Sequence, residues 1–513
     1  MPDLNGHFQG SVSEPAELCV FAPLRETDFV PRVASGLKEE NVPAKAQSRK
    51  EDGAVVDRLM IGLNRFAFVS LLALIVLVAI PFGTVEPWWI SVYECAVFGL
   101  GALWIIEALI SGAWNFSERQ FIAPIAALLA FVFIQSITLS GVLSGVGSTS
   151  ADPFETRLMF FKFLALCLNG ALLLRYVSTS SRLRTLIHLI VGVAVASAIF
   201  GIARQALQHT EIGFLLPYLR RDSGFGQFVN KNHFAFLMEM AIGLAIGLVF
   251  GGAVRRQHLL IFISAVALMW TGLVLTSSRG GLLSSLAQIV FLVLMLAWRK
   301  SAKCGERCLD QSEFRTRRSR FRSIAPALGL SICLLAIVAV SALWVGGDLL
   351  VTRLASLPGE IKTESAEPHA GVRRREVWGA TWQLIKAHPL AGTGLGAYSV
   401  AITRFHDASG KWTPEAAHND YLELLAAGGL IGTALVVWFA FVFLKSARQR
   451  ICSADTLGRA ACLGALTGIF GVMAHNLVDF GLHVTANAVV FIALMVIATR
   501  ATGSGNRVAK SGQ

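Results

Sequence analysis

Charged residues are scarce in this chain. Asp, Glu, Lys and Arg make up 15% of its 513 residues, against about 25% in soluble domains. Hydrophobic residues make up 54%, and apolar runs of about 20 residues, each long enough to cross the hydrocarbon core of a bilayer, recur from Phe66 to Thr499. The scarcity of charge excludes an ordinary soluble protein and predicts an all-α polytopic membrane protein.

Three further features are missing. No Asp-x-Asp occurs, so the common diphosphate-bound metal site has no obvious ligands. None of the eight cysteines falls in a predicted external loop, which argues against a disulfide framework, and Cys304 and Cys308 lack the two further ligands that zinc would need. No internal repeat stands out, which weighs against a transporter built from two related halves. We therefore expect no cofactor and no metal.

About twelve membrane spans are predicted between two polar tails. The spans lie near residues 66–82, 88–111, 121–141, 158–174, 185–207, 233–252, 258–276, 281–298, 325–346, 419–444, 459–478 and 484–499. Residues 1–58 are polar, have no signal-peptide pattern and are predicted to be a mostly disordered tail. The domains expected are thus a tail (1–58), spans one to nine (59–346), an external loop (347–417), spans ten to twelve (418–500) and a second tail (501–513).

The net charge of +12 follows the topology. Every second connection between spans is rich in Lys and Arg, whereas the short loops 83–87 and 141–156 lack both. The basic positions are 175, 182, 184, 255, 256, the run from 299 to 322, 445, 448 and 450. This positive-inside pattern places both tails in the cytoplasm and argues against nucleic acid as a partner. Residues 315–322 could bind anionic lipid headgroups, although a topogenic cytoplasmic loop is the simpler interpretation.

The external loop is predicted to fold, because a structureless loop of its length would be unusual. Residues 376–388 read as an amphipathic helix with Trp378 and Trp382 on one face, which suits a helix in the headgroup layer, and Pro389 ends it. The glycine-rich stretch 392–397 is interpreted as a turn and not as a dinucleotide site. Such a turn could still present backbone N–H groups to a phosphate.

Arginines on the external side are the candidate pyrophosphate ligands. Arg279 lies in the short connection between spans seven and eight, where a snorkelling side chain is the alternative and a cation in need of an anion is favoured. Residues 373–375 are three arginines that open the amphipathic helix. A solvated charge run is the usual reading of such a cluster, but guanidinium groups bind phosphate oxygens as forks. Arg374 and Arg375 are therefore predicted to join Arg279.

His418, at the start of span ten, is the candidate catalytic base. An imidazole has an unperturbed pKa of about 6.5, which suits proton abstraction at neutral pH. The alternative is a helix cap formed by Asn419 or Asp420 with a bystander histidine. Asn419 is also a candidate substrate ligand.

Two further groups of polar residues, at the start of span six and at the end of span eleven, could have either a structural or a functional role. At the start of span six, Asn230 or Asn232 could cap the helix, or Lys231, Asn232 and His233 could line a pocket for a sugar. At the end of span eleven, His475 and Asp479 are four residues apart. A structural pair between these two side chains is slightly favoured over a functional role, although ionisable groups inside spans are usually functional.

Together these pieces resemble the O-antigen ligase and polymerase family of bacterial envelope enzymes. The matching motifs are Ser-Arg-Gly at 278–280, Arg-x-x-x-Trp at 374–378, His-Pro-Leu-x-Gly-x-Gly-Leu-Gly at 388–396 and His-Asn-x-x-Leu at 418–422, followed by glycines at 428 and 432. Phe-Val-Asn-Lys-Asn-His at 228–233 and Val-Asp-Phe at 478–480 look like the polymerase branch. The resemblance covers roughly residues 60–500.

The resemblance implies a metal-independent, inverting glycosyltransferase in the bacterial inner membrane. Its donor would be a glycan carried on undecaprenyl pyrophosphate. Its acceptor would be the hydroxyl of a glycan or of a lipid-linked glycan at the periplasmic face, and the enzyme would be surrounded by membrane lipids. A chain-length regulator or an export protein is a candidate partner. A polymerase is favoured over a ligase that delivers polymer to lipid A–core or protein, and a twelve-span transporter is the remaining alternative.

Overall fold

The computed structural model describes residues 44–112, 118–137, 150–207, 224–308, 374–406 and 414–500. The chain divides into two compact units, Met1–Arg58 and Leu59–Gln513. Among the described residues ten helices are long and apolar enough to cross a membrane, α15 is shorter, and no β-strand forms. The protein is therefore an all-α polytopic membrane protein, as its composition predicts.

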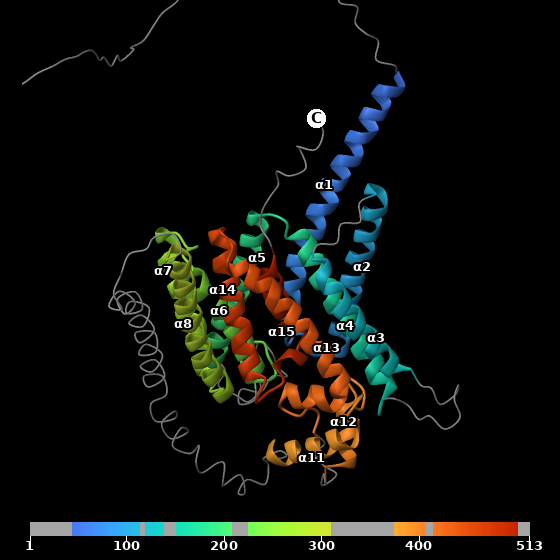
Figure 1. Ribbon diagram of the computed structural model, residues 1–513, viewed down its shortest axis with the longest axis vertical. Helices are drawn as coiled ribbons and strands as arrows, with labels where there is room; N and C mark the ends of the chain where they lie inside the picture. The colour runs from blue at the N-terminus through green and yellow to red at the C-terminus, as the bar shows by residue number, and fades with distance from the viewer. Residues whose placement is uncertain are drawn as a thin grey trace, which may run out of the picture. The chain divides into compact units, whose positions relative to one another are not determined.

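The helices follow the predicted spans closely. Every predicted span overlaps one of them except 325–346, which lies outside the described residues, as does Arg373. The helices (Figure 1) are α1 (Ala44–Ala79), α2 (Pro87–Ser111), α3 (Ile122–Ser136), α4 (Pro153–Tyr176), α5 (Ser180–Leu207), α6 (Lys231–Phe250), α7 (Leu259–Leu275), α8 (Arg279–Cys308), α11 (Arg374–Ala387), α12 (Tyr398–Ala401), α13 (Asp420–Ile451), α14 (Thr456–His475) and α15 (Thr485–Thr499), with short 3-10 turns η1 (Arg119–Phe121), η3 (Arg256–His258), η4 (Ile402–Arg404) and η5 (Gly481–His483). Helix α1 begins at Ala44, inside the segment 1–58 that is predicted to be a mostly disordered tail, and residues 1–43 lie outside the described residues.

Helices α6 and α14 form the centre of the second unit. In the apolar stretch of α6, 89% of the residues are buried, and in α14 72%, whereas the other candidate spans bury 28–44%. The two helices can approach closely because glycines face each other. A Cβ at Gly247 would clash with the backbone of Gly464, and one at Gly243 would lie 2.6 Å from the Cα of Gly468. Small residues at such a contact let helix backbones pack directly.

A glycine kink in α13 anchors the glycine-rich turn 392–397. Gly429 has φ 61° and ψ −165°, a conformation open to glycine but strained for other residues. The kink leaves backbone groups without helical partners, and the neighbouring chain pairs with them: Leu430 N–H donates to Pro389 O at 2.9 Å and Gly394 N–H to Ala427 O at 2.9 Å.

This docking occupies the N–H groups of residues 392 to 395 in the glycine-rich turn. Gly392, Thr393 and Leu395 donate to His388 O, Ala426 O and Gln135 Oε1. A turn whose N–H groups already have acceptors does not offer them to a phosphate. Holding α13 at its kink is therefore the turn's role in the structure.

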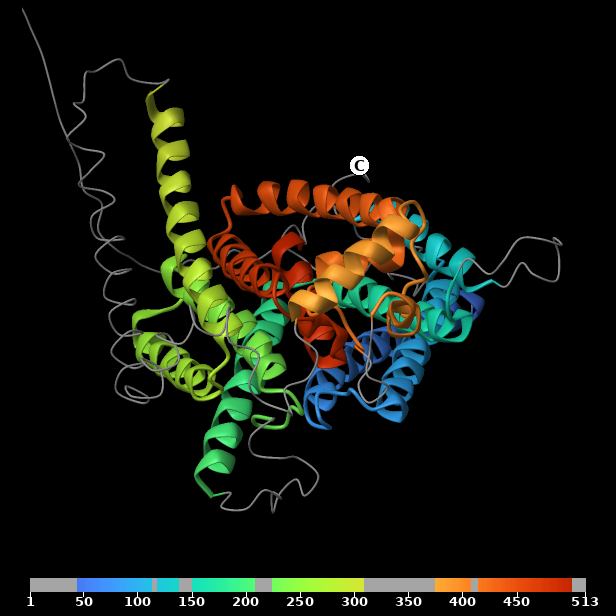
Figure 2. The ribbon, with the colours of Figure 1, turned by 90° about the horizontal axis from the view of Figure 1, so that it is seen from below.

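Helix α11 lies across the end of α13 (Figure 1), and Figure 2 looks onto that end of the molecule. Its face with Val377, Leu384 and Ile385 is buried, with Leu384 and Ile385 in a small core shared with α12, η4 and α13. Trp378 is half-buried, whereas Trp382, one turn further along the helix, is 50% exposed. The buried face of α11 packs on protein, and the predicted position of the two tryptophans in a headgroup layer stays a prediction. The predicted end of the helix before Pro389 is confirmed.

Several connections meet at the end of the bundle that carries α11. Ala486 N–H donates to Gly83 O at 3.1 Å, Ala151 N–H to Thr393 O at 2.8 Å and Asp420 N–H to Asn476 O at 3.1 Å. These bonds join the α1–α2 loop to the start of α15, the α3–α4 loop to the glycine-rich turn, and the α14–α15 connection to the start of α13. The polar groups singled out in the sequence therefore gather at one end of the molecule.

Candidate active site

A buried carboxylate, Asp479, joins four separate segments of the chain. Its side chain is 1% exposed. Asn232 Nδ2 donates to its Oδ2 at 2.6 Å, Arg374 NH2 lies 3.9 Å from Oδ2 and His418 Nδ1 lies 3.7 Å from Oδ1. The last two distances are those of ion pairs and not of hydrogen bonds. We call Asn232, Arg374, His418 and Asp479 the open cluster, because His418 and Arg374 keep 37% and 45% of their side-chain surface exposed.

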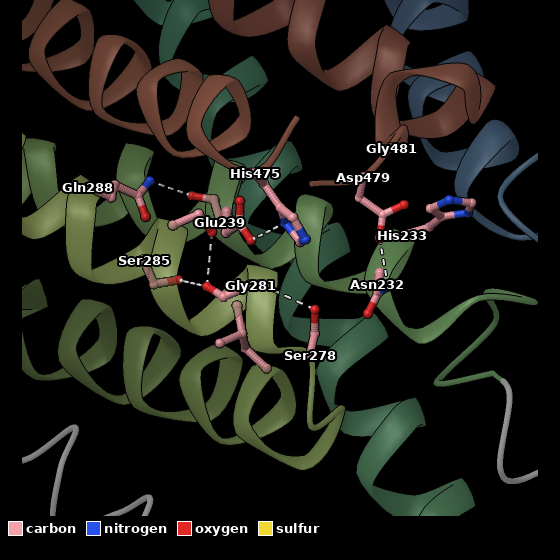
Figure 3. Close-up of polar contacts among 12 residues, drawn as sticks. Asn232, His233, Glu239, Ser278, Gly281, Ser285, Gln288, His475, Asp479 and Gly481 are labelled. Carbon is pink, nitrogen blue, oxygen red and sulfur yellow. Dashed lines mark hydrogen bonds and ion pairs between the residues drawn. The ribbon is translucent and has the colours of Figure 1, made fainter. Parts of the chain in front are cut away.

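Local helix ends hold Asp479 and Asn232 in place. Helix α14 ends at His475, so Asp479 lies in the turn before η5, where Phe480 N–H donates to Oδ1 at 2.9 Å. Asn230 caps α6 by accepting from Asn232 N–H at 2.9 Å. The cap interpretation is thus confirmed for Asn230, and it leaves the Asn232 amide to bond to Asp479 (Figure 3).

His418 is held by its neighbours in an uncommon backbone conformation, with φ 49°. Ala417 O accepts from Trp378 Nε1 at 2.9 Å, and Ala417 N–H donates to Glu423 Oε2 at 2.8 Å. On the other side, Asn419 caps α13 by accepting from residues 421 and 422 and donates to Leu477 O at 2.9 Å. Strained backbone that is over-determined by its surroundings clusters at functional sites. The cap predicted at Asn419 is confirmed, and it presents His418 to the cluster.

The charges around Asp479 keep it ionised. Burial by itself would raise the pKa of this carboxyl, but the His418 ring, His233, the Phe480 N–H and Arg374 together lower it to about 2. A depressed carboxyl pKa stabilises the fold at every pH above the ordinary value, and that stabilisation is lost as the pH falls from about 4 to about 2. At neutral pH Asp479 is therefore a fixed negative charge beside an imidazole and a guanidinium.

Phe480 separates three histidines. Its ring centroid lies 4.8 Å from that of His418, 5.1 Å from that of His233 and 5.6 Å from that of His483, each edge to face. His233 is 8% exposed, and its carbonyl accepts from Asn487 Nδ2 at 3.0 Å. His233 thus borders the open cluster through Phe480, while Lys231, also predicted there, is half-buried at the first position of α6.

Arg279 lies on the turn next to the open cluster. It is exposed and is the first residue of α8. A Cβ on the next residue, Gly280, would lie 3.2 Å from Val478 Cγ2, so the turn packs against the residue before Asp479. Arg375 is exposed beside Arg374 at the start of α11.

Sequence reasoning missed one member of the cluster and mispaired another residue. Asp479 is absent from the predicted site residues, although an ionisable residue beside a span, near external histidines and arginines, is a sign of function. The interpretation of His475 and Asp479 as an i,i+4 pair is wrong: His475 Nδ1 lies 2.8 Å from Glu239 Oε1. Because α14 ends at His475, the helical geometry that such a pair needs does not reach Asp479.

Residues 264–437 match the model of a protein family described as O-antigen ligase. This match supports the resemblance to the O-antigen ligase and polymerase family over that part of the chain. The matched segment contains Arg279, Arg374 and His418, whereas Asn232 and Asp479 lie outside it. A search of curated proteins finds none that matches. The match indicates a glycosyltransferase-like membrane enzyme, and the matched family implies lipid-linked glycan substrates.

Proposed function

We propose that the chain transfers a glycan from undecaprenyl pyrophosphate to an acceptor hydroxyl at the periplasmic face of the bacterial inner membrane. The observation that carries the proposal is the open cluster, in which a partly exposed imidazole and a partly exposed guanidinium share one buried carboxylate. A base and a phosphate ligand side by side are what such a transfer requires.

His418 is the proposed base. Its Nδ1 faces Asp479, which favours the tautomer that carries the proton on Nδ1 and leaves Nε2 to accept a proton, as in other histidine–carboxylate arrangements. The acceptor oxygen attacks the anomeric carbon as its proton passes to Nε2. The bond from that carbon to the pyrophosphate oxygen breaks with inversion, and the electron pair leaves on the pyrophosphate.

Arg279, Arg374 and Arg375 are the proposed ligands of the departing pyrophosphate. Arg374 is already within ion-pair distance of Asp479, so the carboxylate orients it while its exposed surface remains available to substrate. Fork-shaped guanidinium groups aimed at developing phosphate charge stabilise the transition state. Lys231, Asn232 and His233 form the proposed sugar-facing edge, and Asn419 positions His418 as the cap of its helix.

The charge distribution supports the proposed orientation. The end opposite α11 carries Arg175 and Arg182 at one helix connection and Arg450 and Arg459 at another. A cytoplasmic end is expected to collect such residues, which leaves the open cluster at the periplasmic end and the two tails in the cytoplasm. The first reaction proposed is polymerisation of an O-antigen or exopolysaccharide, and ligation is the second candidate.

Chromosomal His418→Ala and Arg279→Ala strains test the function, with His258→Ala as the control because His258 is an exposed histidine outside the cluster. Surface polysaccharide and undecaprenyl-linked intermediates are measured after membrane levels are matched. Single lipid-linked repeats that accumulate indicate a polymerase, and long polymer retained on the carrier indicates a ligase. Unchanged polysaccharide and intermediates in both variants, in a strain without a redundant enzyme, would overturn the proposal and revive a transporter.

A further inference from the structure

Glu239 and His475 form a second polar group, which we call the closed pair. Their side chains are 0% and 1% exposed, and His475 Nδ1 lies 2.8 Å from Glu239 Oε1. The ring of Phe236 stacks on the imidazole with centroids 4.1 Å apart and planes 12° apart. Apolar side chains of similar volume often stabilise a fold at least as well as a buried pair of this kind. The closed pair therefore calls for an explanation other than stability.

The closed pair packs directly behind the turn that carries Arg279. A Cβ at Gly280 would clash with His475 Nε2 and would lie 2.6 Å from Cδ2. The imidazole thus fills the space that a side chain at position 280 would occupy. If the imidazole moved toward α8, it would collide with Gly280, the residue that follows Arg279. If it moved away from α8, Gly280 would lose the side chain against which it packs.

Helix α8 is tied to α6 and α14 beyond this contact. Within α8, Ser285 Oγ donates to Gly281 O at 2.7 Å. One turn further on, Gln288 Nε2 donates to Glu239 O at 2.8 Å and to Thr467 O at 3.0 Å. The two Gln288 bonds tie α8 to α6 and α14 beside the closed pair (Figure 3), so they fix how α8 lies against these two helices.

We infer that the closed pair positions Arg279 for the pyrophosphate. The inference rests on the proposed function, because it assigns the pair a role only through that arginine. His475 sets where the first turn of α8 lies relative to α14, and four residues after His475 the same segment supplies Asp479. The pair thereby fixes the Arg279 turn against the segment that carries the open cluster. Small displacements of a binding group can cost about 100-fold in rate.

A double-mutant cycle tests the inference. Glu239→Ala and Arg279→Ala are compared singly and together in proteoliposomes. The donor is lipid-linked glycan extracted from a strain that lacks this protein, and rates are expressed per amount of folded protein. Glu239→Ala is expected to lower kcat/KM for the donor roughly 10- to 100-fold, and to add less than about 3-fold when Arg279 is already Ala, because contacts that act through one residue are not additive. Glu239→Gln keeps a hydrogen-bond acceptor for Nδ1 and is expected to restore most of the loss.

Glu107→Ala is the matched control. Glu107 is also a buried carboxylate, 5% exposed, and accepts from Tyr176 Oη at 2.6 Å and from Arg175 NH2 at 3.2 Å, away from the open cluster. Its replacement is expected to leave kcat/KM per folded protein unchanged. If Glu239→Ala does not accumulate, Gly280→Ala takes its place in the cycle, since it pushes on the same imidazole from the other side.

Two results would overturn the inference. One is an equal loss from Glu239→Ala with and without Arg279, and the other is a loss from Glu107→Ala as large as that from Glu239→Ala. In both cases the proposed function would stand as long as Arg279→Ala and His418→Ala are impaired. Wild-type transfer in those two single variants would instead overturn the proposed function itself.

Discussion

The open cluster and the closed pair each place a histidine beside a carboxylate. The two groups are linked by one segment, in which His475 of the closed pair precedes Asp479 of the open cluster by four residues. His475 and Glu239 are 1% and 0% exposed, whereas His418 is 37% exposed beside an Asp479 that is itself buried. The closed pair is enclosed by Phe236 and Gly280, and the open cluster faces outward through His418 and Arg374. The difference in burial therefore suits the two histidines to different roles. The buried His475 can position a helix, whereas the partly exposed His418 can exchange a proton with a substrate.

The largest effect expected is on catalysis at the open cluster. General-base catalysis contributes about 100- to 10,000-fold, so His418→Ala is expected to lower kcat by that factor while the folded protein accumulates normally. The initial rate of glycan transfer in proteoliposomes measures it, with His258→Ala as the control. A loss smaller than about 10-fold would remove His418 from the role of base.

A substitution in the closed pair is expected to lower the stability of the fold, whereas a substitution of His418 in the open cluster is not. Removing one partner of a buried pair leaves the other unpaired and costs about 3–5 kcal/mol, so Glu239→Ala is expected to lower the unfolding temperature in detergent. His418→Ala removes a half-exposed side chain and should leave that temperature nearly unchanged. Equal shifts in the two variants would erase the distinction between the clusters.

Replacing Asp479 by Asn sharpens the comparison through pH. With a pKa of about 2, Asp479 keeps its charge throughout the neutral range, so Asp479 itself does not produce an acid limb in the pH–rate profile. Asn removes an anion 3.7 Å from His418 Nδ1 and so disfavours the imidazolium. The acid limb is expected to move to lower pH and the rate to fall. A limb that stays in place would show that Asp479 does not act on the titrating group.

The smallest effect concerns the support of His418. Trp378→Phe keeps an aromatic ring but loses the hydrogen bond from Nε1 to Ala417 O, 2.9 Å long, which is worth about 1 kcal/mol. A fall in kcat of about 5-fold is expected, with little change in donor KM. Trp382→Phe is the control, because Trp382 is exposed on the same helix. Equal effects of the two changes would contradict this role.

The spans could be predicted because a membrane helix is specified by its own apolar length, whatever it packs against. The sequence also places Arg279, Arg374 and His418 on one side, since alternate connections share a side. Which helices lie at the centre could not be predicted. The burial of α6 and α14 depends on Gly247 meeting Gly464, a contact between residues far apart in the chain that no local pattern reports.

The candidate site could be predicted only in part for the same reason. His418 and Arg374 stand out from their place in the external loop, but the Asp479 carboxylate that joins them is bound by Asn232, 247 positions away. The four-residue spacing predicts a pair between His475 and Asp479, yet the helix ends at His475, whose partner is Glu239 on α6. Pairing between helices is set by packing, which sequence spacing does not encode.

Chemical rescue of His418→Gly tests the central claim most directly. The purified variant is assayed in proteoliposomes with extracted lipid-linked glycan, with and without added imidazole. If His418 takes the acceptor proton, the variant is nearly inactive, still binds donor, and regains part of its rate as imidazole is added. A His418→Gly protein that transfers glycan at the wild-type rate without imidazole would contradict the account.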